Sequence, residues 1–247
     1  MVLLQEPATQ SALESGPGQA GRSLTLRDRL KLPMTYSYGA LLIAVTVLVS
    51  VLSDTQQTRV IQHASTNLHN LLAGRFGTLF SSAFVIGDGT AGALLIPLLV
   101  CLLILAEWRF GAVSLLRIFI AGHIGATLVV AGGLWVAVSV KWLPTSISLA
   151  EDVGVSYGAM AVIGSLIVVL PAKWRPTWAI SLGAVAVAGV IMGHTFTNVG
   201  HLIALTIGLL TGWLLLRSGH VHAHRLNRFE MGLLVVAAVL GYILLVG

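Results

Sequence analysis

A serine flanked by glycines and a histidine preceded by a glycine are the two residues of this chain best suited to chemistry. The serine segment reads GVSYG around Ser156, and the histidine segment reads NVGH and ends at His201. A neutral imidazole can take the proton of a serine hydroxyl and later give it to a leaving amine. Glycines beside a serine also leave backbone amides free to stabilise an oxyanion. The pair predicts an activated serine nucleophile.

Each motif on its own also has a purely structural explanation. Serines in membrane helices often hydrogen-bond to their own backbone, and small residues four apart are common packing devices. Ala204, Gly208 and Gly212 follow His201 in such a stripe. The stripe predicts tight packing against a partner helix on the side of His201. If that partner is the helix that begins near Ser156, the hydroxyl and the imidazole can meet.

The composition indicates that these residues lie in a membrane. Of 247 residues, 56% are hydrophobic and 9% are charged, and the mean hydropathy is +0.92. A soluble domain carries about 25% charged residues, so this chain has too few charges to cover a water-exposed surface. The sequence therefore predicts an all-α polytopic membrane protein.

Charge and cysteine content exclude further classes of function. The chain has a pI near 9.9 but no basic patch interleaved with aromatic residues, so we expect no nucleic-acid partner. The single cysteine, Cys101, lies in an apolar run and excludes disulfides and clustered thiolate sites. We expect no metal and no cofactor.

Seven apolar stretches are long enough to cross a hydrocarbon core, which needs roughly 17 to 25 residues as a helix. They are Met34–Ser53, Gly89–Ala106, Ile118–Val140, Val153–Ala172, Thr177–Gly193, Thr195–Leu216 and Met231–Gly247. We thus divide the chain into a tail (1–33), a membrane core (34–217), a His/Arg-rich loop (218–230) and a seventh transmembrane helix (231–247).

The basic residues predict that the N-terminus is cytoplasmic. With that orientation, eleven of the 14 lysines and arginines lie inside or at the inner interface, as the positive-inside rule requires. Only Arg59, Arg75 and Lys141 then lie outside. The tail is rich in Ser, Gly, Gln and Pro, which predicts disorder, and it has no signal-peptide pattern. We expect a bacterial plasma membrane, with lipid as the surrounding partner.

Two loops are distinctive. Ser53–Asp88 is a long outer connection, and Phe76–Gly87 within it is apolar but too short to span. Such a segment is either an interfacial or re-entrant segment or a short amphipathic surface helix, and the sequence favours neither reading. The inner loop Ser218–Glu230 carries three alternating histidines, which are more often solvated than metal-bound. These histidines are His220, His222 and His224.

Polar residues inside predicted spans mark pathways or reactive sites, because they are costly there. With the orientation above, Ser156 and His201 lie at a similar depth, a few residues below the outer surface. His194 and Asn198 lie near the start of the same span as His201. His123, in the third span, has no serine in its own span and is interpreted as a packing residue.

At these motifs the sequence resembles the rhomboid family of intramembrane serine proteases. GVSYGAMAVIG resembles the serine segment of that family, and NVGHLIALTIGLLTG resembles its histidine helix. LLILAEWRFG, with Glu107 and Arg109, and the following RIFIAGHIG are similar to the turn between its second and third spans. The resemblance covers roughly Met34 to Arg217, and the seventh span is similar to a six-plus-one arrangement.

The resemblance implies a six-helix core plus a seventh helix, with a Ser–His dyad in a cavity open to the outside. Carried over by position, Ser156 is the nucleophile and His201 the general base. Transmembrane proteins would be cut near their outer boundary. Weaker candidates for oxyanion binding or support are Gly154, Tyr157, Asn198 and His194.

The sequence also departs from that family. Its second span usually carries a His and an Asn that help to bind the oxyanion, and the corresponding residues here are Ala91 and Leu95. Tyr157 replaces a common glycine after the serine. Met160 stands where an aromatic ring often supports the histidine. Loss of one oxyanion donor costs about 3 to 4 kcal/mol.

Two hypotheses on function therefore remain. The first is an intramembrane serine protease that uses Ser156 and His201, with oxyanion binding mainly from backbone amides. The second is a catalytically inactive relative that binds transmembrane helices as clients. A transporter or channel is disfavoured, because no repeat is evident and no acidic residue lies near the centre of a span.

Overall fold

The computed structural model describes residues 30–87, 89–218 and 226–246. The chain divides into a unit of residues 1–31 and a unit of residues 32–247, and the fold is that of the second unit. The predicted tail lies almost wholly outside the described residues, as do His220, His222 and His224. Every regular element among the described residues is a helix.

Six helices are long and apolar enough to cross a membrane, by length and composition. A multi-pass membrane protein is therefore confirmed, and six of the seven predicted spans correspond to these helices. They are α2 (Pro33–Ser50), α6 (Gly89–Phe110), α7 (Ala112–Ser139), α9 (Arg175–Gly193), α10 (Phe196–Arg217) and α11 (Arg228–Val246).

The fourth predicted span is shorter than expected. In place of Val153–Ala172 the structure has α8 (Ser156–Ser165) continued by the 3₁₀ turn η3 (Leu166–Val169). Gly154 has φ +119°, which breaks the helix at its start. Leu170 precedes Pro171 and is extended, as residues before proline usually are. An α-helix of ten residues is about 15 Å long, roughly half the hydrocarbon core.

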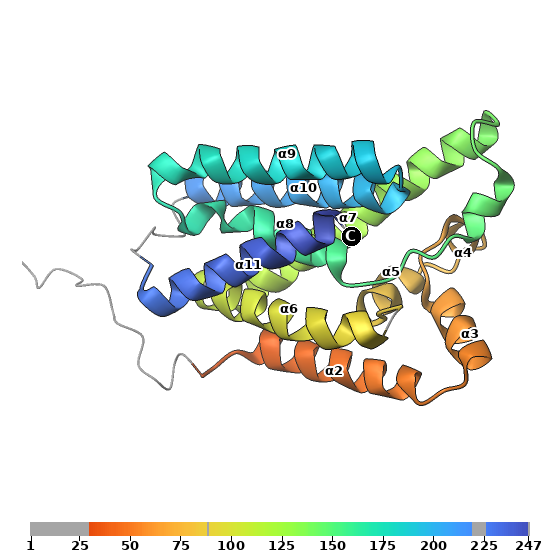
Figure 1. Ribbon diagram of the computed structural model, residues 1–247, viewed down its shortest axis with the longest axis horizontal. Coiled ribbons are helices and arrows are strands. Elements are labelled where there is room, and N and C mark those ends of the chain that lie inside the picture. Colours follow the sequence, from red (N-terminus) through yellow and green to blue (C-terminus); the bar gives the residue numbers. More distant parts are fainter. Residues whose placement is uncertain (1–29, 88, 219–225, 247) are drawn as a thin grey trace, which may run out of the picture. The chain divides into compact units, whose positions relative to one another are not determined.

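The short helix α8 lies inside the bundle. It packs most extensively against α10 and α7, with further contacts to α6 and α11. Nine of its ten residues are buried, and Ser156 is the exception. Figure 1 shows α8 between α10 and α6, with α9 beside α10 and α2 beside α6. Longer helices thus enclose α8, and Ser156 at its start is its one residue that is not fully buried.

The long connection between α2 and α6 folds into short helices. They are α3 (Asp54–Ala64), α4 (Leu68–Leu72), α5 (Thr78–Ser81) and the 3₁₀ turn η1 (Ser82–Phe84). The apolar segment Phe76–Gly87 is thus not one amphipathic surface helix but two short turns. Ser82 and Ala83 are buried, and the Tyr38 hydroxyl of α2 donates a 2.6 Å hydrogen bond to the Ala83 carbonyl.

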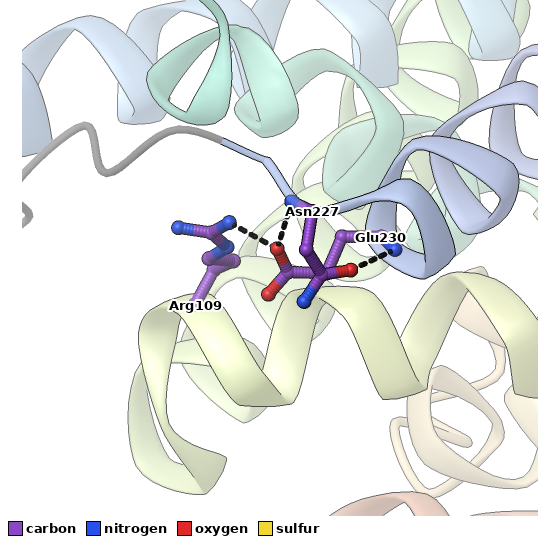
Figure 2. A network of polar contacts seen from close by, with 3 residues as sticks. All are labelled: Arg109, Asn227 and Glu230. Carbon is purple, nitrogen blue, oxygen red and sulfur yellow. Dashed lines mark hydrogen bonds and ion pairs between the residues drawn. The ribbon is translucent and has the colours of Figure 1, made fainter. Parts of the chain in front are cut away.

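Two carboxylates hold the helices together at the end of the bundle away from α3, α4 and α5 (Figure 1). Glu107 of α6 accepts hydrogen bonds from the Met34 and Thr35 amides and from the Thr35 hydroxyl, so it caps the start of α2. At the start of α11, Glu230 accepts from Arg109 at 2.7 Å. Figure 2 shows Glu230 and Asn227 bonded reciprocally beside Arg109, an arrangement that begins α11 three residues earlier than predicted.

Candidate active site

Ser156 is the first residue of α8 and is half-buried. Among the described residues, no side chain caps this end of the helix. The amide groups of the first turn therefore have no acceptor within α8, because the first acceptors of a helix serve the following turn. Backbone donors next to a serine hydroxyl are the arrangement that an oxyanion site requires.

His201 lies in the second turn of α10, and its side chain is buried. The small-residue stripe that follows it packs on α8, as the sequence predicted. A Cβ added to Gly208 would collide with the Ala161 carbonyl of α8, and one added to Gly212 would lie 2.9 Å from the Ser165 carbonyl. Only glycine permits this approach at Gly208. The helix that begins at Ser156 is therefore the partner of the histidine helix.

Tyr157 connects the two motifs. Its ring meets the His201 imidazole edge to face, with ring centroids 5.5 Å apart and planes at 80°. The same ring lies directly on Gly200, where any Cβ would collide with it. Met160, by contrast, is an apolar core residue. The aromatic contact that the sequence lacks at Met160 is thus made by Tyr157, one turn earlier on the same helix.

No hydrogen bond joins Ser156 to His201. Within the described part of the chain, neither ring nitrogen of His201 has a hydrogen-bond partner. Ser156 is nevertheless the immediate neighbour of Tyr157, whose ring contacts the imidazole. A buried imidazole without any hydrogen-bond partner is uncommon, and such a group usually has a functional role or binds water. Hydrogen bonds between catalytic residues are often long in unliganded proteins and tighten when substrate binds.

Three weaker candidates have other structural roles. The Gly154 amide donates to the Ser82 carbonyl at 2.9 Å, so it is already engaged. The Asn198 side-chain amide donates to the Gly189 carbonyl at 2.7 Å and ties α10 to α9. His194 is exposed, has φ +52° and ends α9. The fourth weak candidate, Tyr157, makes the ring contact with His201 described above.

Ala91 and Leu95 both lie on α6 and are half-buried. Neither side chain can donate a hydrogen bond, so neither can contribute to oxyanion binding. Among the described residues, no group of three His, Cys, Asp or Glu side chains is placed to hold a metal ion.

Sequence reasoning missed a second serine–histidine pair. His123 of α7 does have a serine partner, because its Nε2 lies 3.1 Å from the Ser82 hydroxyl of η1. Both side chains are buried. The serine comes from a different element, 41 residues earlier, so no local pattern could indicate it.

Asp152, four residues before Ser156, was also missed. Burial raises the pKa of its carboxyl to about 6, and the nearby Tyr157 hydroxyl partly counteracts this effect. Its main chain is tied to the α3–α4 turn: the Asp152 amide donates to the Ser65 hydroxyl at 2.8 Å, and the Thr66 amide donates to the Asp152 carbonyl at 3.0 Å. The loop before α8 is thus held from outside the helix.

Comparison with known proteins finds a family match over most of the chain. A family model described as rhomboid-like protein matches residues 29–222. The matched region includes α2 through α10, with Ser156 and His201, and ends before α11. Neither a curated protein nor a solved structure matches the chain.

Proposed function

We propose that this chain, which belongs to the family of rhomboid-like proteins, is an intramembrane serine protease with Ser156 as nucleophile and His201 as general base. The observation that carries the proposal is the buried His201 imidazole. It lies against Tyr157, the residue next to Ser156, and has no hydrogen-bond partner among the described residues. An imidazole in this position has a nitrogen available for the serine proton.

The proposed reaction is an acyl transfer. His201 takes the proton of the Ser156 hydroxyl while the Ser156 oxygen attacks a peptide carbonyl carbon. The imidazolium then protonates the leaving amine, and a water molecule, activated by the same imidazole, hydrolyses the acyl-enzyme. Amides of the first turn of α8 stabilise the oxyanion in both steps.

The oxyanion site is the weakest part of this protease. Ala91 and Leu95 provide no donors, and Asn198 is bonded to Gly189. Each missing donor lowers the turnover rate by about 10² to 10³. We therefore propose a slow enzyme.

Substrates are proposed to be transmembrane proteins cut near one membrane face. We place the N-terminus in the cytoplasm of a bacterial cell and the start of α8 toward the outer face, on the basis of the distribution of lysine and arginine. The partners are then membrane-spanning segments and the surrounding lipid.

Labelling with a fluorophosphonate probe tests the proposal. The probe forms a covalent bond with an activated serine, and it would be applied to the parent, Ser156→Ala and His201→Ala in detergent or liposomes. The protease requires labelling of the parent and none of either variant. A folded, monodisperse parent that takes up no probe would contradict the proposal.

A second candidate function is helix binding without cleavage. It is favoured by the unformed Ser156–His201 hydrogen bond and by the apolar residues Ala91 and Leu95. Photocrosslinkers introduced at these two positions in vivo would capture membrane helices in both cases. If the parent protein leaves the captured helices uncleaved and also takes up no fluorophosphonate probe, the results would support this second function.

A further inference from the structure

We infer that Ser82 and His123 are positioning residues for Ser156, acting through the backbone of the loop before α8. The inference concerns the placement of the Ser156 side chain. Its consequence for catalysis rests on the proposed function, but the placement itself can be measured without it.

A continuous series of hydrogen bonds connects α7 to this loop. His123 Nε2 and the Ser82 hydroxyl lie 3.1 Å apart, and the Ser82 carbonyl accepts from the Gly154 amide at 2.9 Å. Gly154 precedes Ser156 by two residues. One residue, Ser82, therefore binds the histidine with its side chain and the loop with its main chain.

Gly154 is the point at which such a contact has most effect. Its φ of +119° turns the chain into the first turn of α8, a conformation that glycine reaches at little cost but does not itself hold. No side chain caps α8. The Ser82 carbonyl therefore fixes the last flexible residue before the helix, and with it the direction of the Ser156 hydroxyl.

The surroundings make the Ser82–His123 bond hard to replace. The exposed fraction is 0% for Ser82 and 4% for His123. His123 borders a cavity of about 90 Å³ whose other lining residues come from α2, α5, η1 and α7 and are apolar, among them Tyr38, Phe84 and Phe119. The apolar lining offers no replacement hydrogen bond to a partner left alone here.

The positions of Ser65 and Thr66 explain why the loop would not simply unfold without this bond. They hold Asp152 independently, two residues before Gly154. Loss of the Ser82–His123 bond should thus leave the loop attached at Asp152 and loosen it from Gly154 to Ser156. The defect is expected to be local.

The experiment measures Ser156 with a chemical probe that needs no catalysis. In a Cys101→Ala background, the thiol of a Ser156→Cys variant is alkylated with a water-soluble maleimide, and its rate is followed by mass. Ser82→Ala and His123→Leu remove the Ser82–His123 hydrogen bond, whereas His123→Gln supplies an amide that can bond to the Ser82 hydroxyl instead. Thr127→Val is the matched control, because Thr127 is buried on α7 one turn further and its hydroxyl has no partner among the described residues.

We expect Ser82→Ala and His123→Leu to change the alkylation rate by roughly tenfold, the effect of one lost buried hydrogen bond. His123→Gln should restore most of the parent rate, and Thr127→Val should leave it unchanged. Equal rates in all folded variants would overturn the inference, and so would an equal change in Thr127→Val. If His123→Leu fails to fold, the alkylation rates of Ser82→Ala and His123→Gln still test the inference.

Fluorophosphonate labelling of the same variants with Ser156 intact separates this inference from the proposed function. In an active parent, Ser82→Ala should lower the maximal labelling rate roughly tenfold without changing the half-saturating probe concentration. An unlabelled parent whose thiol variant still responds to Ser82→Ala would reject the protease and keep the positioning role. A labelled parent whose thiol variants alkylate at the same rate with and without Ser82→Ala would support the protease and reject the positioning role.

Discussion

Tyr157 contacts His201 and the residue before it, because its ring meets the imidazole edge to face and lies directly on Gly200 of the same helix. In the family that the sequence resembles, a glycine is common at this position, and Tyr157 is one of the weaker candidates for oxyanion binding or support. The structure instead gives the ring a supporting contact. The hydroxyl of Tyr157 lies toward Asp152 and Thr197 without forming a well-aligned hydrogen bond.

Substitution of Tyr157 separates its ring from its hydroxyl. Tyr157→Phe should keep the fluorophosphonate labelling rate within about twofold, because the edge-to-face contact remains. Tyr157→Leu should lower that rate by roughly two- to tenfold, since an aromatic pair contributes about 0.5–1.5 kcal/mol. Labelling rates of purified, folded variants check this. Equal rates for Phe and Leu would show that the ring does not orient His201.

Asp152 predicts a pH dependence of stability. Burial raises the pKa of its carboxyl from 3.8 to about 6, so between these pH values the folded protein holds a proton that the unfolded chain has released. Retention of this proton stabilises the folded state fully below about pH 4, and this stabilisation is lost as the pH rises through 6. Above pH 6 the ionised carboxylate lowers the free energy of unfolding by about 3 kcal/mol, since one pKa unit corresponds to about 1.4 kcal/mol.

Asp152→Asn should therefore raise the unfolding temperature at pH 7.5 and leave it nearly unchanged at pH 4. Unfolding followed by tryptophan fluorescence at the two pH values measures the difference from the parent. Glu151→Gln is the matched control, because Glu151 is the adjacent carboxylate but is exposed. An identical pH response in the parent and Asp152→Asn would contradict the raised pKa.

At the scale of elements, α8 is positioned by glycines of its neighbours. Gly122 of α7 approaches Ala161, and Gly208 of α10 approaches the Ala161 carbonyl from the other side. A helix buried on all sides needs such close approach, since bulkier residues would push the long helices apart. The depth at which Ser156 begins follows from this packing.

Gly208→Ala should destabilise the protein by about 1–3 kcal/mol, because the new methyl group must displace the Ala161 backbone. Gly183→Ala on α9 is the control. No atom lies within 4 Å of the position of its Cβ, so alanine should be neutral or slightly stabilising there. Unfolding temperatures in one detergent compare the two. A harmless Gly208→Ala would show that α8 and α10 are not in this close contact.

The long helices were predictable and α8 was not, for a physical reason. Hydropathy identifies a helix when an apolar run is long enough to cross the bilayer, and six runs are. In the fourth run, Gly154 and Pro171 shorten the helix from both ends. The mean hydropathy of the run does not register these two residues, because the residues between them are mostly apolar. The Ser82–His123 bond was unpredictable because it joins elements 41 residues apart.

At the scale of the whole molecule, α11 is held to the core by charge as well as by apolar packing. The Arg109–Glu230 ion pair has side-chain exposures of 10% and 12%, and Asn227 completes the cap of α11 (Figure 2). The family match ends before this helix. The ion pair thus joins an additional helix to α6, the helix that also contains Ala91 and Leu95.

Glu230→Gln should lower the free energy of unfolding by about 1.5–3 kcal/mol, the contribution of a charge-assisted hydrogen bond. Thermal unfolding of the purified protein measures the loss. Asp54→Asn is the control, because Asp54 is an exposed acidic residue in the first turn of α3. If both variants unfold at the parent's temperature, α11 is held by apolar packing alone.

The proposed protease requires Ser156 to be an activated nucleophile. Peptide mapping by mass spectrometry after fluorophosphonate treatment tests this most directly. We expect one adduct on Ser156, absent in His201→Gln and retained in Ser165→Ala. Ser165 is the control because it lies buried on the same helix and donates to the Val162 carbonyl. An adduct on another serine, or on Ser156 regardless of His201, would contradict it.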